Sequence, residues 1–199
     1  MSNDGSAPIL LSREAGLTTV SSAPRHLRHR RRVPSYVLVP ALVAGWGAMM
    51  LAGPHVAAPA DIRPFALFVH LAALVLGMGA VLSLDWFGLM WLAGRQDLVS
   101  LVRAAQVAHT PIWIGLAGLS LSGVLLAPDT SAPLTLVKLV AVLVVALNGL
   151  AAATVQRRLL ALHGRTPPRR LLLTAVLVAT VSQAGWWTAT VVGFLNAQQ

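Results

Sequence analysis

Long apolar segments alternate with short polar segments along most of this chain. The apolar runs cover residues of about 36–52, 65–92, 110–126, 134–156 and 171–195. A helix needs about 20 apolar residues to cross the roughly 30 Å hydrocarbon core of a bilayer. The pattern therefore predicts an all-α integral membrane helical bundle with five transmembrane helices, the last four of which form a four-helix core.

The polar breaks between the runs carry helix start and stop signals. Thr110 and Pro111 precede the third run as a capping residue and a proline at the first helical position. Residues 128–131 have the composition of a turn. Residues 95–106 repeat polar side chains about every three positions, with apolar side chains largely opposite. This spacing predicts a separate short helix that lies at the membrane surface.

The N-terminal segment differs from the rest of the chain. Residues 1–24 are rich in Ser, Ala, Pro and Thr and lack a sustained apolar pattern. Together with the basic segment that follows, they predict a disordered cytoplasmic arm of residues 1–33 ahead of a transmembrane domain of residues 34–199. A basic cluster ends the arm, formed by Arg25, Arg28, Arg30, Arg31 and Arg32. It indicates a topology signal for the first span or a patch that binds anionic lipid. A cleaved signal peptide is the alternative interpretation of this region, and it would leave four spans.

Composition supports a membrane protein. Of the 199 residues, 56% are hydrophobic and 11% are charged, with a mean hydropathy of +0.73, whereas a soluble domain has about 25% charged residues. Cysteine is absent, which excludes disulfides and thiolate metal ligands. The net charge of +9 arises from arginines in short blocks between apolar runs, without interleaved aromatic residues. This distribution favours membrane topology over nucleic-acid binding.

The distribution of basic residues predicts the orientation. With the N-terminus in the cytoplasm, the inner segments carry 13 of the 15 Lys and Arg residues, and the outer loops carry only Arg63. The positive-inside rule favours this arrangement. We therefore expect a multi-pass protein of the plasma membrane with its C-terminus outside. Homo-oligomerisation stays open.

Two polar residues lie at similar depth in the predicted spans. His70 lies roughly 8 Å below the outer end of the second span, and Lys138 lies roughly 6 Å below the outer end of the fourth. Polar side chains within spans are functional candidates by default. The pair predicts an outward-facing site, with the imidazole as ligand or proton acceptor and the ammonium as anion clamp. The alternative is a Lys that extends to the headgroups and a His that is hydrogen-bonded within the bundle.

Three further residues are candidates for ligand contact. Asp85 could relay protons or bind a cation, or it could pair with an arginine at the inner interface. Asn148 could bind a ligand or join two helices by a hydrogen bond. Trp187, next to Trp186 and near Gly185, could wall a planar ligand or serve in packing. Soluble-enzyme motifs, such as a phosphate-binding loop or His-Glu-x-x-His, do not occur in the sequence.

Small residues predict close helix packing. Gly118 and Ser122 form a small-xxx-small pair in the third span. The fifth span carries a stripe of small residues, which are Ser182, Gly185, Ala189 and Gly193. We expect both patterns to mark packing faces.

The polar positions also carry a family resemblance. His70 is followed by Gly77, a Leu-Ser-Gly-Val-Leu-Leu segment covers 121–126, and a Lys138-containing helix ends near Asn148 and an Arg-Arg pair. This arrangement, over roughly residues 65–160, resembles the copper-resistance protein D (CopD-like) membrane domain. The layout is also similar to that of HemJ-type protoporphyrinogen oxidases, which have a functional His and a later Lys.

The resemblance implies a ligand site with His70 as haem or metal ligand and Lys138 as partner for an acidic group. Copper and haem are the candidate ligands. The chain departs from both families, because it has five Met in all and no Trp between Leu71 and Gly77. A CopD-like binding protein, a haem-dependent redox enzyme of HemJ type and a structural subunit without a ligand are therefore three hypotheses, and whether the protein is an enzyme stays undecided.

Overall fold

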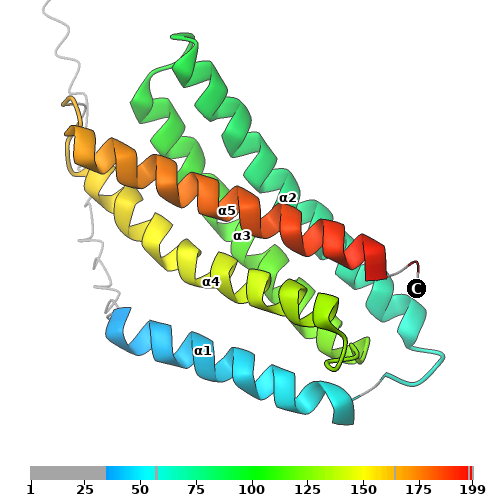
Figure 1. The fold of residues 1–199 in the computed structure, drawn as a ribbon. Helices are drawn as coiled ribbons and strands as arrows, with labels where there is room; N and C mark the ends of the chain where they lie inside the picture. Colours follow the sequence, from blue (N-terminus) through cyan, green and yellow to red (C-terminus); the bar gives the residue numbers. More distant parts are fainter. Residues whose placement is uncertain (1–34, 57, 164, 197, 199) are drawn as a thin grey trace, which may run out of the picture. The chain divides into compact units, whose positions relative to one another are not determined.

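The computed structural model describes residues 35–199 apart from 57, 164, 197 and 199. The predicted N-terminal arm and its arginine cluster lie outside the described residues. Within them the chain forms five α-helices, one short 3₁₀ turn at Gly53–His55 and no strand (Figure 1). The helices are α1 (Ser35–Ala52), α2 (Arg63–Leu92), α3 (Leu98–Leu125), α4 (Pro133–Leu160) and α5 (Arg169–Asn196). The predicted all-α class is confirmed.

Four of these helices, α2 to α5, are long and apolar enough to cross a membrane, by length and composition; α1 is shorter. Large apolar side chains cover their outer surfaces, and Val75, Val107 and Leu173 are 73%, 77% and 69% exposed. Contiguous exposed apolar surface of this kind is unfavourable in water and favourable in lipid. The fold is therefore compatible with a multi-pass membrane protein.

The start of α3 differs from the prediction. Residues 95–106 do not form a separate surface helix that ends before Pro111, because α3 runs without interruption from Leu98 to Leu125 with Pro111 inside it. Asp97 caps its start by accepting a hydrogen bond of 2.9 Å from the Ser100 N–H. Val102 is buried, and its carbonyl accepts a 3.3 Å hydrogen bond from Gln156 of α4. Packing of this first segment thus outweighs the helix-breaking tendency of Pro111.

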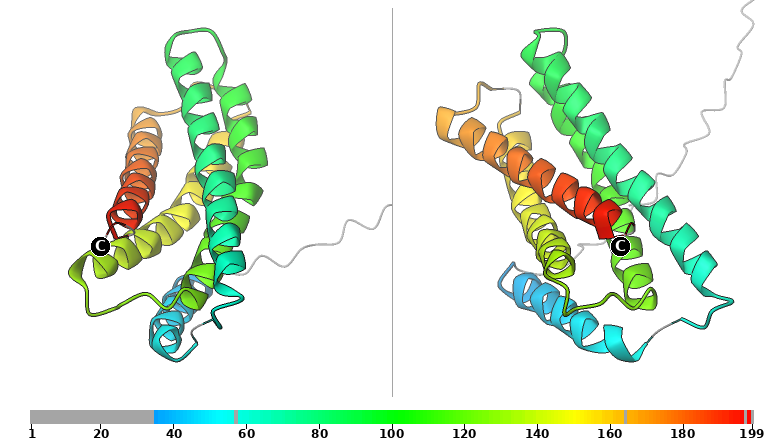
Figure 2. Two further views of the ribbon diagram at one scale, coloured as in Figure 1. Left: turned by 90° about the vertical axis from the view of Figure 1, so that its right-hand side faces the viewer. Right: turned by 45° about the vertical axis from the view of Figure 1, so that its right-hand side comes forward.

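The long helices form two antiparallel hairpins. Helix α2 packs along α3, α4 packs along α5, and α1 makes smaller contacts with α3 and α4 (Figure 2). Trp46 attaches α1 to α4 by donating a hydrogen bond of 3.1 Å from Nε1 to the Leu139 carbonyl.

Glycine contacts bring the helix pairs close together. A Cβ added to Gly115 would lie 2.6 Å from Cα of Gly77, and a Cβ added to Gly118 would lie 2.8 Å from Cβ of Ala73. In the second hairpin, a Cβ on Gly185 would overlap a methyl group of Val145. Small residues at these positions permit close approach of the backbones. The predicted packing roles of Gly118 and Gly185 are confirmed.

A buried apolar cluster joins the hairpins. It comprises Met78, Val81, Leu116, Val145, Ala146 and Trp186. Trp186 of α5 is only 2% exposed, and its ring lies against Gly77 of α2. This tryptophan links α5 to the α2–α3 hairpin.

Candidate functional site

Polar side chains gather at the end of the bundle where α2 and α4 begin and α3 and α5 end. The group consists of His70, Ser122, Thr135, Lys138 and Asn196. We call it the His70 cluster. Two of its contacts connect different helices directly, since His70 bonds Ser122 and Asn196 bonds Thr135 at 3.1 Å. The helix starts and ends bring these residues together from positions far apart in the sequence.

Hydrogen bonding fixes the form of the His70 imidazole. Nδ1 of His70 lies 2.9 Å from the hydroxyl oxygen of Ser122. The Ser122 hydroxyl donates its single hydrogen to the carbonyl of Gly118, one turn earlier, at 2.5 Å. A hydroxyl that has used its hydrogen can only accept. In the tautomer that satisfies both contacts, Nδ1 carries the proton and donates it to Ser122, which leaves the lone pair on Nε2 free.

The surroundings of His70 support this assignment. The Leu119 carbonyl also lies near the imidazole. A Cβ added to Gly123 would lie 3.6 Å from the Cε1 atom of His70, so glycine leaves space beside the ring. The side chain is half-buried, and Ser122 is 3% exposed. The ring is therefore hydrogen-bonded and only partly covered.

Lys138 brings a positive charge to the same end of the bundle. Its ammonium lies near enough to His70 to act on the imidazole electrostatically. The Lys138 stem passes close to Gly193 of α5, where an added Cβ would lie 3.9 Å from Cδ. Among the described residues no carboxylate forms an ion pair with Lys138. The structure therefore brings together the two residues that the sequence placed at one depth.

The other three predicted site residues lie elsewhere. Asp85 accepts a hydrogen bond of 2.5 Å from Nε2 of Gln183 and joins α2 to α5. Asn148 donates a 2.9 Å bond to the Val178 carbonyl and joins α4 to α5. Both contacts lie deeper along the helices toward the opposite end, apart from the His70 cluster. In the described part of the chain, neither Arg95 nor Arg103 forms an ion pair with Asp85.

The tryptophan pair divides between two environments. Trp187 is 50% exposed on the outside of the bundle, whereas Trp186 is buried against Gly77. The Nε1 group of Trp186 is buried without a hydrogen-bond partner among the described residues. The sequence held a signal for this difference. Position 186 lies one helical turn after Ser182 and therefore on the face of the small-residue stripe, whereas position 187 does not.

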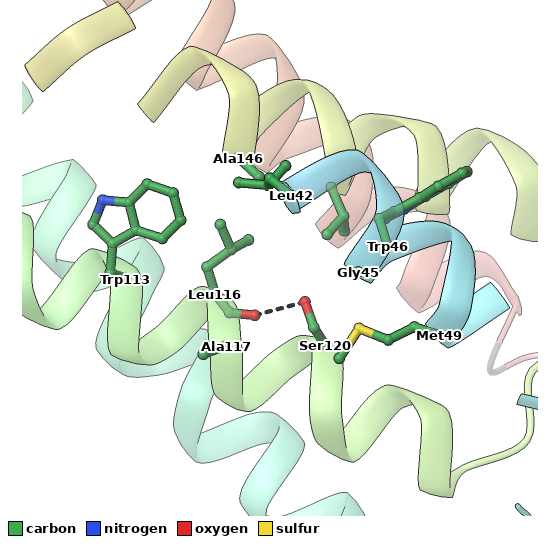
Figure 3. A pocket seen from close by; sticks show the side chains of 10 residues that line it. Leu42, Gly45, Trp46, Met49, Trp113, Leu116, Ala117, Ser120 and Ala146 are labelled. Atoms are coloured by element: carbon green, nitrogen blue, oxygen red, sulfur yellow. Dashed lines mark hydrogen bonds between the residues drawn. The ribbon is translucent and has the colours of Figure 1, made fainter. Parts of the chain in front are cut away.

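A separate apolar cleft lies between α1, α3 and α4. It has a volume of about 240 Å³, and Trp46, Met49, Trp113 and Ser120 are among the residues that line it (Figure 3). The Ser120 hydroxyl donates to its own helix, at 2.8 Å from the Leu116 carbonyl. Neither His70 nor Lys138 lines this cleft. It therefore does not belong to the His70 cluster.

Within the described ranges, no group of three or more His, Asp or Glu residues is placed to hold a metal ion. His70 is the one His, Asp or Glu residue of the His70 cluster.

Comparisons of the chain with protein-family models, with curated proteins and with solved structures give no match.

Proposed function

We propose that this is a multi-pass membrane protein of CopD-like type that binds haem at the His70 cluster. The carrying observation is the hydrogen bond from Nδ1 of His70 to Ser122, since it leaves Nε2 available to a metal. Metal-binding histidines commonly donate their other ring N–H to a fixed acceptor, which sets the tautomer and the ring orientation. The proposal includes five spans, with the N-terminus in the cytoplasm and the His70 cluster at the outer face of the plasma membrane.

The donor set favours haem over a bare copper ion. Haem iron needs only one or two axial ligands from the protein, because the porphyrin supplies four nitrogens. Copper would need further ligands beside His70, and the Lys138 ammonium would repel it. The same ammonium attracts a carboxylate, such as a haem propionate. His70 and Lys138 together therefore suit a metal complex that carries acidic groups.

Each residue has a defined task in this proposal. Ser122 holds the His70 ring in the Nδ1–H form, His70 presents Nε2, and Lys138 orients an acidic group of the ligand. Gly123 leaves space beside the imidazole. Haem, when bound, supplies a centre that can take up or release one electron. No residue of the cluster is assigned a catalytic step, so the proposal concerns binding.

A haem titration of the purified protein in detergent tests this function. We expect the wild-type protein to shift the Soret band of added haem with saturable, one-to-one stoichiometry, and His70→Ala to abolish the shift. His163→Ala is the matched control, because His163 is exposed in the α4–α5 connection. Metal analysis of the same samples is included. An unchanged Soret band in His70→Ala, or stoichiometric copper without a Soret band, would overturn haem binding at His70; absence of both ligands would favour a structural subunit.

Ser122→Ala should weaken haem binding by about 10–100-fold, because loss of an outer-shell partner of a metal-binding histidine has effects of that size. The variant keeps His70 but removes the acceptor that fixes its tautomer. Ser120→Ala is the control, since Ser120 makes the same type of bond to its own helix and faces the cleft beside α1. The dissociation constants from the same titration give the comparison. Equal losses in both variants would contradict the role of Ser122.

A further inference from the structure

Arginines collect at the end of the bundle opposite the His70 cluster. We call this surface the arginine end; its members are Arg95, Arg103, Arg157, Arg158, Arg165, Arg169 and Arg170. All of these side chains are exposed. They come from the α2–α3 and α4–α5 connections and from the helix ends that flank them. The hydrogen bond from Gln156 to the Val102 carbonyl ties the two hairpins together there. The charges therefore belong to one end of the folded unit.

Little acidic charge opposes these arginines. The chain has no Asp or Glu after Asp129, so the entire α4–α5 hairpin contains none. Asp97 is the acidic residue of the α2–α3 turn. Hydrogen bonds from Ser100, first from its side chain and then from its backbone N–H, hold the pKa of Asp97 below its usual range. Asp97 is thus ionised but engaged as the cap of α3, and the arginine end keeps a large positive excess.

Two of the arginines lie in the first turn of a helix, where the helix dipole is unfavourable for a positive charge. Arg169 and Arg170 open α5, and the first turn of that helix has no acidic residue. The N-terminus of a helix carries partial positive charge, so cations in the first turn are unfavourable there. Local helix electrostatics therefore does not explain these two residues. A bound external anion would instead be attracted both by these arginines and by the partial positive charge of the α5 N-terminus.

We propose that the arginine end binds the phosphate groups of anionic phospholipids. It terminates helices that are suited to cross a membrane, which places its side chains at the level of the headgroups. Guanidinium groups bind phosphate oxygens in a two-pronged geometry that the Lys ammonium does not provide. All basic residues of this surface are arginine, although Lys satisfies topology equally well. The α4–α5 connection contains no Phe, Tyr or Trp on which nucleic-acid bases could stack.

Native mass spectrometry of the full-length protein in detergent, with added phosphatidylglycerol or phosphatidylcholine, tests this proposal. We expect phosphatidylglycerol to bind the wild type, and the triple change Arg165→Gln, Arg169→Gln and Arg170→Gln to weaken that binding at least about tenfold. The corresponding change of the three residues to Lys should give an intermediate affinity, because it keeps charge and removes the planar fork. Arg63→Gln, at the opposite end, is the control and should bind as the wild type does.

The same experiment can overturn the proposal. Equal binding of both lipids would exclude a preference for anionic headgroups, because phosphatidylcholine also carries a phosphate group. Unchanged phosphatidylglycerol binding in the triple Gln variant would exclude the arginine end as the lipid site. Stronger binding of a short DNA duplex than of phosphatidylglycerol would indicate that the arginine end binds nucleic acid and would overturn the lipid proposal. Circular dichroism of the triple variant should show wild-type helix content, since the three side chains are exposed. Haem binding at the other end should not change, so this test is independent of the proposed function.

Discussion

Gly115→Ala should lower the free energy of unfolding by about 3 kcal/mol, at the upper end of the range for overpacking of a core. The new methyl group would lie 2.6 Å from Cα and 2.7 Å from N of Gly77, and 2.8 Å from the Ala73 carbonyl oxygen. All three obstacles belong to the backbone of α2, which cannot move aside as a side chain can. Helices α2 and α3 would have to separate along the contact, with loss of dispersion energy.

Gly79→Ala is the matched control for this prediction. Gly79 lies on α2, and an added Cβ would meet nothing within 4 Å. Alanine is intrinsically better in a helix than glycine by about 1 kcal/mol. The two substitutions should therefore change the thermal unfolding midpoint, followed by circular dichroism in detergent, in opposite directions. Equal shifts would contradict the close α2–α3 contact. The Gly115 variant should also bind haem less well, because separation of these helices weakens the His70–Ser122 bond.

Trp186→Ala should destabilise the protein by about 3–5 kcal/mol, the usual effect of removing a large aromatic side chain from a packed core. Trp186 is 2% exposed and fills the space beside Gly77, where α5 meets α2. Its loss would leave a cavity between the two hairpins. Its Nε1 group has no hydrogen-bond partner in the described part of the chain, so no hydrogen bond is lost with it. The expected effect is therefore one of packing.

Trp187→Ala provides the comparison within the same helix turn. Trp187 is 50% exposed, and a substitution on the outer surface should change the free energy of unfolding by less than about 1 kcal/mol. Unfolding by a denaturing detergent measures both variants against the wild type. A larger effect at position 187 than at position 186 would refute the burial of Trp186 at the hairpin interface.

The sequence by itself determined the helical class, the four long apolar helices and the similar depth of His70 and Lys138. Each of these depends on local features, namely the length of an apolar run and the constant rise of 1.5 Å per residue that places two side chains at one depth. The glycine contacts at 118 and 185 were likewise readable, because small residues at helical spacing have few uses other than close approach. The continuity of α3 could not be predicted from the sequence, since Thr-Pro is compatible with both a helix start and a helix interior.

Only the tertiary structure decided which side chains face each other. Apolar residues cover every side of these helices, so their pattern does not distinguish the interior face from the lipid face. For that reason the sequence did not identify Ser122 as the acceptor for His70, nor Trp186 rather than Trp187 as the buried tryptophan. The same holds for Asp85 and Asn148, whose partners, Gln183 and the Val178 carbonyl, lie on α5. These contacts depend on how one helix is rotated against the next, and that rotation is set by packing between segments far apart in the chain.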